Sequence, residues 1–167
     1  APLTGENRTL VRAGLHQIRR PQRQGIMALI GAAGLRPANI SAGDVSFVLG
    51  PRLNAAGRLE SALAAFDLLM AQEVSVAAML AQKLEIQNRE RQDITRQLQV
   101  EAEQIALRAG TEPLLLFAAH PDFNPGVVGL VASRLTEQYY RPSIVAHYGP
   151  EFTRASCRSI SEFYITD

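Results

Sequence analysis

Hydrophobic residues recur every three or four positions along the first two thirds of the chain, which is the spacing of one face of an α-helix. This spacing predicts four helices, over residues 4–20, 22–34, 62–70 and 75–108. The last of these would be about 50 Å long. In the second helix we expect four apolar side chains to be buried: Ile26, Met27, Leu29 and Ile30.

Two shorter stretches in this part depart from the regular spacing. Ser41 and Asp44 have the spacing of a capping-box variant, which predicts a short helix that ends near Leu49. The sequence GPRLNAAGRL, residues 50–59, mixes glycine and proline with two arginines and an asparagine. Because this mixture is typical of turns, we expect a shaped loop over these residues.

The middle of the long helix differs from its two ends. Residues 87–93 read QNRERQD and are polar on every face, whereas apolar stripes precede and follow them. A helix that is polar all round can connect two lobes across solvent. The alternatives are a surface helix with one weak stretch and a part of a coiled coil.

The pattern changes class after Gly110. Residues 114–118 form a short apolar run that predicts a buried parallel strand, and an amphipathic helix over residues 126–140 and a second strand over residues 143–147 follow. These three elements form a βαβ unit, and a third strand is expected over residues 153–160. The sequence therefore predicts an α/β protein with a helical N-terminal lobe, a long connecting helix and a C-terminal βαβ-type lobe, which ends at Asp167 without a closing helix.

Composition and charge narrow the function classes. Cys157 is the single cysteine, which excludes an internal disulfide and is consistent with a cytoplasmic protein. No apolar run has the roughly 20 residues that span a membrane. Residues 1–58 hold eight arginines against two acidic residues, whereas the rest of the chain has more acidic than basic residues. Arginine suits phosphate recognition, although codon bias would produce the same excess.

Candidate catalytic groups are few. The three histidines, His16, His120 and His147, lie on different predicted elements, and no Asp-x-Asp, His-His or His-x-x-x-His spacing occurs. His120 and Asp122 come nearest to a ligand pair, but we expect no metal there. We expect Cys157 to be a structural residue.

A phosphate site has more support. Arg52 and Arg58 flank the predicted loop, and Arg154, Ser156 and Arg158 share one face of the last strand by its period of two. Hydroxyl groups and guanidinium groups together suit a terminal phosphate. The alternative is a set of solvated surface arginines. The segment 124–126, Asn-Pro-Gly, precedes a helix N-terminus that could hold an anion or a base edge.

Four segments occur in the order and spacing of a known family. They are GPRLNAAGRL at residues 50–59, NRERQ at 88–92, PGVVGLVASRLTEQYYRPSIV at 125–145 and SCRSI at 156–160. Over essentially its whole length the chain resembles the RecJ single-strand-specific exonucleases of the DHH phosphoesterase superfamily. The resemblance implies a 5′ to 3′ exonuclease of DNA repair and recombination that depends on Mn²⁺ or Mg²⁺ and acts on single-stranded DNA.

The resemblance also implies how the chain is divided. Residues 1–70 would be the helical end of the DHH domain, residues 71–109 the connecting helix, and residues 110–167 the first half of the DHH-associated domain. The metal-ligand motifs of the family, including the DHH triplet, are absent from this sequence. We therefore expect no catalytic residue and no metal ligand in this chain, no nuclease activity from the chain alone, and no metal bound by it.

Site residues carry over by motif. Arg58 in NAAGR and Ser156, Arg158 and Ser159 in SCRS match family positions near the 5′ phosphate and the DNA backbone. Further loop or DNA contacts are expected at Arg52, Asn54, Asn124 and Gly126. Asn124 stands where the family usually has histidine, which puts a histidine-dependent contact there in doubt.

Two other functions fit the same resemblance. One is an inactive DHH-family scaffold or protein-interaction module, and the other is a DHH-type phosphoesterase that acts on small nucleotides. No membrane partner is expected, and the sequence indicates no particular protein partner.

Overall fold

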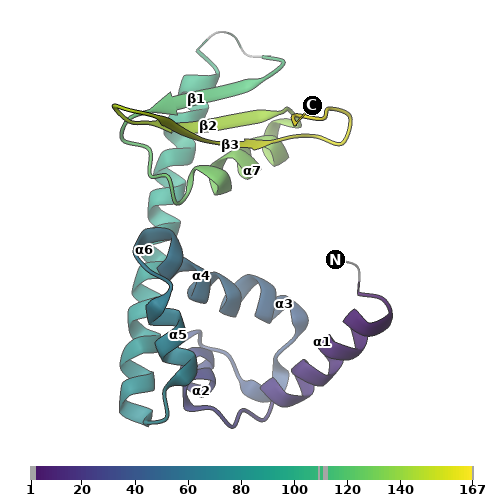
Figure 1. Ribbon diagram of the computed structural model, residues 1–167. Coiled ribbons are helices and arrows are strands. Elements are labelled where there is room, and N and C mark those ends of the chain that lie inside the picture. The colour runs from purple at the N-terminus through teal and green to yellow at the C-terminus, as the bar shows by residue number, and fades with distance from the viewer. Residues whose placement is uncertain (1–2, 109, 111–112, 167) are drawn as a thin grey trace. The chain divides into compact units, whose positions relative to one another are not determined.

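The computed structural model describes residues 3–108, 110 and 113–166. The chain divides into two compact units, Ala1–Arg89 (unit 1) and Glu90–Asp167 (unit 2). The boundary falls inside the long helix α6, Val74–Ala106 (Figure 1). The long helix expected from the sequence is therefore confirmed, with its ends within two residues of the predicted ones. No helix in the described part of the chain is long and apolar enough to cross a membrane.

Unit 1 is helical throughout. Its elements before α6 are α1 (Gly5–Ile18), α2 (Gln24–Ala32), a 3₁₀ turn (Pro37–Asn39), α3 (Ala42–Asp44), a π-helical turn (Val45–Leu49), α4 (Gly50–Leu59) and α5 (Leu63–Met70). The capping box is present as predicted. The Ser41 hydroxyl accepts from the Asp44 N–H at 3.2 Å, and the Asp44 carboxylate accepts from the Ser41 backbone N–H at 2.8 Å. The Ser41 hydroxyl also donates to the Asp44 carboxylate at 2.7 Å, and this bond, with that from the Ser41 backbone N–H, lowers the pKa of Asp44.

The core of unit 1 lies between α2, α4, α5 and the first half of α6. Its most deeply buried members include Leu29, Ile30, Ile40, Ala56, Leu68 and Leu84. The expectation that Met27 is buried is wrong, because its side chain is 48% exposed. Gly25 and Leu29, one helical turn apart, face the core, and Met27 lies on another side of the helix.

The predicted loop over residues 50–59 is wrong, because these residues form helix α4. Pro51 lies in the first turn, where its missing N–H has no helical partner to lose. Ala55 and Ala56 have no exposed surface, so the interior of unit 1 holds the segment in a helix despite its two glycines. Helical turns run without a break from Ala42 to Leu59.

The polar middle of α6 is not solvated on every face. Gln87 and Asn88 are only 5% and 2% exposed, which contradicts the expected solvent-exposed bridge at these two positions. The Gln87 amide nitrogen donates to the Glu60 carboxylate at 3.0 Å, just after the end of α4. The amide nitrogen thus has a protein partner, whereas the buried Gln87 Oε1 has none among the described residues.

Unit 2 is a three-stranded sheet with α7 (Val128–Tyr139) on one face (Figure 1). Strand β1 (Leu116–His120) is parallel to β2 (Ser143–Tyr148), and β3 (Thr153–Arg158) is antiparallel to β2. The βαβ unit and the third strand are therefore confirmed. The first strand begins two residues later than expected, and Leu114 is 86% exposed.

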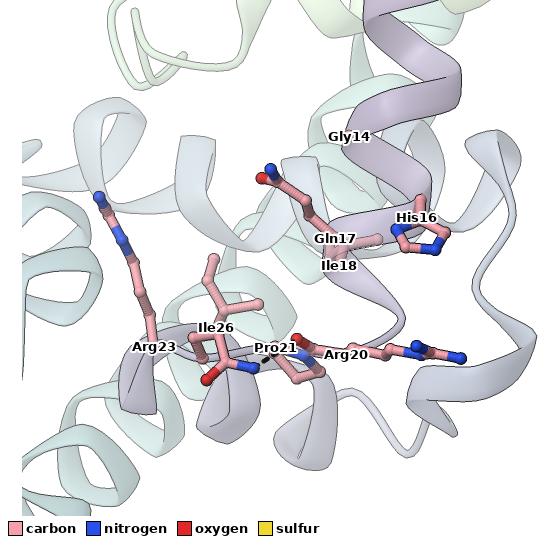
Figure 2. A pocket seen from close by; sticks show the side chains of 9 residues that line it. Gly14, His16, Gln17, Ile18, Arg20, Pro21, Arg23 and Ile26 are labelled. Carbon is pink, nitrogen blue, oxygen red and sulfur yellow. Dashed lines mark hydrogen bonds between the residues drawn. The ribbon is translucent and has the colours of Figure 1, made fainter.

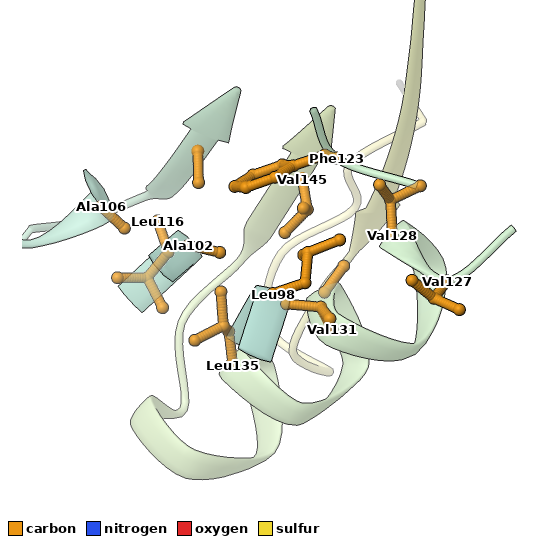
Figure 3. Close-up of a cluster of buried hydrophobic side chains, with 12 residues drawn as sticks. Leu98, Ala102, Ala106, Leu116, Phe123, Val127, Val128, Val131, Leu135 and Val145 are labelled. Atoms are coloured by element: carbon orange, nitrogen blue, oxygen red, sulfur yellow. The ribbon is translucent and has the colours of Figure 1, made fainter. Parts of the chain in front are cut away.

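The core of unit 2 joins the sheet, α7 and the second half of α6 (Figure 3). Helix α6 contributes Leu98 and Ala102, α7 contributes Val131 and Leu135, and the sheet contributes Val145, together with other side chains of the same cluster. The α/β class with its helical first part and βαβ second part is confirmed. The face of the sheet that holds Val145 is therefore the face against α7.

Candidate functional site

Ser156 and Arg158 of β3 lie against the first turns of α7. They pair with Val145 and Ser143 of β2, so their side chains share the face of the sheet that packs on α7. The Arg158 Nε donates to the Ser133 hydroxyl at 3.0 Å, and the Ser133 hydroxyl donates to the Gly129 carbonyl at 3.0 Å. Arg158 is therefore anchored on α7 through one side of its guanidinium.

Gly129 makes this approach possible. A Cβ atom at position 129 would lie 3.1 Å from the Ser156 hydroxyl oxygen and 3.4 Å from the Arg158 Nη2. Because Gly129 has no side chain, the Ser156 hydroxyl and the Arg158 guanidinium both approach the backbone of α7 at this position. Within the described residues neither the Ser156 hydroxyl nor Arg158 Nη2 makes a hydrogen bond, whereas Arg158 Nε and Nη1 are both engaged. Two donors are therefore directed to one place and available to an anion.

The neighbouring candidates serve local structure. The Ser159 hydroxyl donates to the Phe163 carbonyl at 2.5 Å and so closes the turn after β3. The Asn124 side-chain oxygen accepts from the Gly126 N–H at 2.8 Å, and the Asn124 carbonyl accepts from the N–H groups of Val127 and Val128. These contacts explain Asn124 as the residue that shapes the loop before α7.

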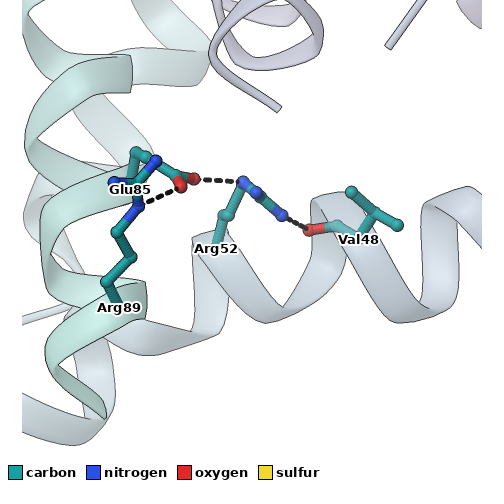
Figure 4. A network of polar contacts seen from close by, with 4 residues as sticks. All are labelled: Val48, Arg52, Glu85 and Arg89. Atoms are coloured by element: carbon teal, nitrogen blue, oxygen red, sulfur yellow. Dashed lines mark hydrogen bonds and ion pairs between the residues drawn. The ribbon is translucent and has the colours of Figure 1, made fainter. Parts of the chain in front are cut away.

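Arg52 is held inside unit 1 by an ion pair (Figure 4). Its Nε lies 2.6 Å from the Glu85 carboxylate, its Nη1 donates to the Val48 carbonyl at 2.7 Å, and both charged side chains are 14% exposed. Arg89 contacts the other oxygen of Glu85 at 2.8 Å. Arg52 therefore links α4 to α6, and this geometry favours a structural role over contact with DNA.

We expect Arg52→Ala to lower the free energy of unfolding by about 2 kcal/mol, because it leaves the largely buried Glu85 carboxylate with only one of its two arginine partners. Urea denaturation followed by circular dichroism measures this. The control is Lys83→Ala, which removes a 3.8 Å contact between side chains that are 54% and 64% exposed. The control should change stability by no more than about 0.5 kcal/mol, and an equal effect of both variants would rule out the linking role.

Glu85 also makes the stability depend on pH. Burial acts to raise the pKa of Glu85, but the hydrogen bonds and charges of Arg89 and Arg52 outweigh it and hold that pKa below 4.5. The contribution of Glu85 is therefore full above pH 4.5 and is lost as the pH falls through the lower folded-state value. The free energy of unfolding of Glu85→Gln should therefore fall less than that of the unmodified chain when the pH is lowered below 4.5, as measured by urea denaturation at several pH values.

Asn54 and Arg58 lie on α4, four residues apart, and both are exposed. Positions four apart on a helix share a face, so the two side chains lie on one side of α4. Arg52, which pairs with Glu85, lies on a different side of α4. The exposed face of α4 that carries Asn54 and Arg58 is thus the part of the motif that a ligand of unit 1 can reach.

The described residues do not fit a metal centre. No three His, Cys, Asp or Glu side chains among them come together in a way that could hold an ion. His120 Nδ1 lies 3.7 Å from Asp122 and 3.9 Å from Glu101, and it accepts from the Asp122 backbone N–H at 3.2 Å. Cys157 is exposed on β3.

A hollow of about 590 Å³ lies where α1 meets α2 (Figure 2). Arg20 and Arg23 give it a basic rim beside His16, and none of the DNA- or phosphate-binding residues expected from the sequence lines it. Arg20 and Arg23 extend in different directions, so their guanidinium groups do not converge on one point. The charge of this hollow therefore does not amount to an anion site.

Sequence reasoning missed Ser133, which orients Arg158. The signal was available, because Ser133 follows Gly129 by one helical turn and must lie on the same face of the predicted helix. Ser156, Arg158, Gly129 and Ser133 together are called the β3–α7 cluster below.

Known proteins resemble this chain over nearly its whole length. No family model matches the chain. The chain is 40% identical to the single-stranded-DNA-specific exonuclease RecJ of Dickeya dadantii over 172 aligned residues, which cover 99% of this chain and 30% of that protein. It is 38% identical to RecJ of Bacillus subtilis, covering 97% of this chain and 21% of that protein.

The chain matches a segment of RecJ exonucleases. Solved structures agree: RecJ of Thermus thermophilus in complex with Mg²⁺ superposes with a TM-score of 0.86 and 31% identity, covering 99% of this chain and 25% of that one. An exonuclease RecJ bound to manganese gives a TM-score of 0.81, also at 31% identity, and covers 99% of this chain and 40% of that one. The resemblance to RecJ seen in the sequence motifs is thus confirmed over nearly the whole chain. The chain spans between 21% and 30% of the length of the two RecJ sequences described above.

Proposed function

We propose that this chain is the part of a RecJ-like 5′ to 3′ single-stranded-DNA exonuclease that binds the DNA strand and its 5′ phosphate. The observation that carries the proposal is the convergence of the Ser156 hydroxyl and the Arg158 guanidinium beside Gly129. A terminal phosphate offers several oxygens to such donors, and a charged acceptor makes these hydrogen bonds strong. Ser159, next to Arg158, is a further proposed ligand, and its hydroxyl would have to leave the Phe163 carbonyl in order to donate to a phosphate.

Unit 1 contributes through α4 in this proposal. Arg58 and Asn54 lie exposed on one face of that helix, and Arg58 supplies a positive charge for a backbone phosphate. Arg52 is assigned the structural role described above. Asn124 and Gly126 shape the loop before α7, so their contribution to binding is indirect.

The hydrolytic step is assigned to parts of the parent enzyme outside this chain. The similar RecJ proteins of known structure were solved with Mg²⁺ or Mn²⁺, and we propose that the parent uses such an ion. The described residues lack a site for it. In the parent, this segment would hold the strand so that the scissile phosphodiester is correctly placed, which is a positioning role. We further propose that the parent acts in DNA repair and recombination.

If the metal-binding residues lie outside this chain, the chain alone should have no nuclease activity. The purified chain should not digest single-stranded DNA in the presence of Mn²⁺, because its described residues cannot hold the ion. Gel analysis of a labelled strand over several hours measures this. Digestion that tracks the chain through purification and is abolished by a chelator would show that a metal site exists in this chain.

Binding measurements separate the exonuclease from its two rivals. Fluorescence anisotropy with strands of 2, 6, 12 and 20 nucleotides at two salt concentrations should show affinity that rises with length and falls with salt. A phosphoesterase for small nucleotides would bind the shortest ligand as well as the longest. An inactive scaffold or protein-interaction module would bind none of them, and either result would overturn the proposal.

A further inference from the structure

A second hollow lies in unit 2 beside the β3–α7 cluster. It has a volume of about 330 Å³, and its lining includes Pro125 and His147 together with Phe152 and Arg154. Arg154 pairs with His147 across the two strands and shares its face of the sheet with Ser156. At the rise of a β-strand, Arg154 and Ser156 are about 7 Å apart, a distance that one nucleotide spans. The hollow is therefore within one nucleotide of the proposed phosphate ligands.

The β2–β3 turn holds an aromatic ring at this hollow. The Gly149 N–H donates to the Phe152 carbonyl at 3.1 Å and closes the turn through residues 150 and 151. Phe152 is nevertheless 59% exposed, and the Arg154 guanidinium carbon lies 5.2 Å from the centroid of its ring. The arginine steadies the ring through a cation–π contact and leaves it accessible. An accessible ring with a fixed position is a stacking platform.

His147 adds a group that can recognise a polar edge. Its Nδ1 is buried and has no hydrogen-bond partner among the described residues. Its Nε2 is directed to Gly149, another residue of the lining, since a Cβ there would lie 3.6 Å from it. Because no protein contact sets the tautomer through Nδ1, Nε2 can either donate or accept a hydrogen bond.

We propose that this hollow is a nucleobase site, in which Phe152 stacks on a base of the bound strand and His147 contacts its edge. The inference rests on the proposed function and extends it, because it assigns a base contact where only phosphate contacts were argued. Every base has an aromatic face, so stacking gives affinity without sequence preference. Arg154 contributes in two ways, because it holds the Phe152 ring in place and adds positive charge next to the DNA strand.

The test combines one substitution with strands that lack a base. We use 5′-phosphorylated 12-mers that carry an abasic site at one of the first four nucleotides, and measure their affinity by anisotropy. For the unmodified chain, one of these abasic positions should weaken binding about 5-fold or more. For Phe152→Ala that loss should disappear, whereas Phe152→Tyr should retain it. The control is Phe117→Ala, which removes a ring of similar exposure, 54%, from the opposite face of the sheet.

The outcomes distinguish this inference from the proposed function. If no abasic position matters, or if Phe152→Ala leaves the loss unchanged while 5′-phosphorylated DNA still binds, the nucleobase site is wrong and the phosphate site stands. Titration with deoxyadenosine monophosphate gives a second arm that needs no strand. Weak binding that Phe152→Ala abolishes would support the base site even if longer DNA does not bind, and failure of both ligands would overturn both proposals.

Discussion

Gly25→Ala is expected to lower the free energy of unfolding by about 3 kcal/mol. This is the largest loss of stability that we expect from any glycine-to-alanine substitution in the chain. The reason is a close approach of two helices in unit 1. A Cβ atom at position 25 of α2 would lie 1.7 Å from the Leu68 carbonyl oxygen of α5. That oxygen belongs to helix backbone and cannot rotate away, so α2 and α5 must separate. Urea denaturation followed by circular dichroism measures the change.

Gly31→Ala is the matched control in the same helix. A Cβ atom at position 31 would meet nothing within 4 Å, so the substitution removes glycine's flexibility without a clash. It should raise stability by about 0.5 kcal/mol. If Gly25→Ala proved as harmless as Gly31→Ala, the packing of α2 on α5 through Gly25 and Leu68 would be refuted.

Arg158→Ala is expected to weaken binding of 5′-phosphorylated single-stranded DNA by about 1.5–3 kcal/mol, which corresponds to a loss of roughly 10- to 150-fold in affinity. The substitution removes a charged donor that Ser133 already orients, so the ligand loses a preorganised contact. Anisotropy with a labelled 12-mer measures it. The side chain is exposed, and the fold should therefore remain intact.

Arg108→Ala controls for the loss of one positive charge. Arg108 is exposed just after the end of α6 and belongs to the same unit as Arg158. Its removal should change affinity by less than about 2-fold, as expected for a charge that only contributes to the general field. Equal losses for the two variants would mean that Arg158 acts through net charge and does not contact the phosphate.

The periodic parts of the fold could be predicted from the sequence. The period of two in β3 places Ser156 and Arg158 on one face, and the structure has them there. The apolar spacing also indicated the long helix and the βαβ order. These features depend on regular repeats within one element, so they are visible without knowledge of which elements touch.

The helix over residues 50–59 could not be predicted in the same way. Glycine and proline are turn formers on average, but Pro51 lies in the first turn, where it costs no hydrogen bond. Ala55 and Ala56 are small enough to be completely buried, and contacts with other elements then decide the conformation. Tertiary burial therefore outweighs local preference in this segment.

The different environments of Arg52 and Arg58 could not be predicted from the sequence either. Arg52 and Arg58 are the same residue type in the same motif, yet Arg52 contacts Glu85, which lies 33 positions further along the chain. No local pattern reports such a partner. The start of β1 was predicted too early for a related reason, since the pairing of Leu116 with Ser143 sets where the strand begins.

The most direct test of 5′-phosphate binding compares two strands that differ in one group. The same 12-mer is prepared with a 5′ phosphate and with a 5′ hydroxyl, and each competes with a labelled strand for the purified chain. The β3–α7 cluster predicts that the phosphorylated strand binds about 10-fold more tightly or better, and that Arg158→Ala removes the preference. Equal affinity of the two strands for the unmodified chain would contradict a terminal-phosphate site in this segment.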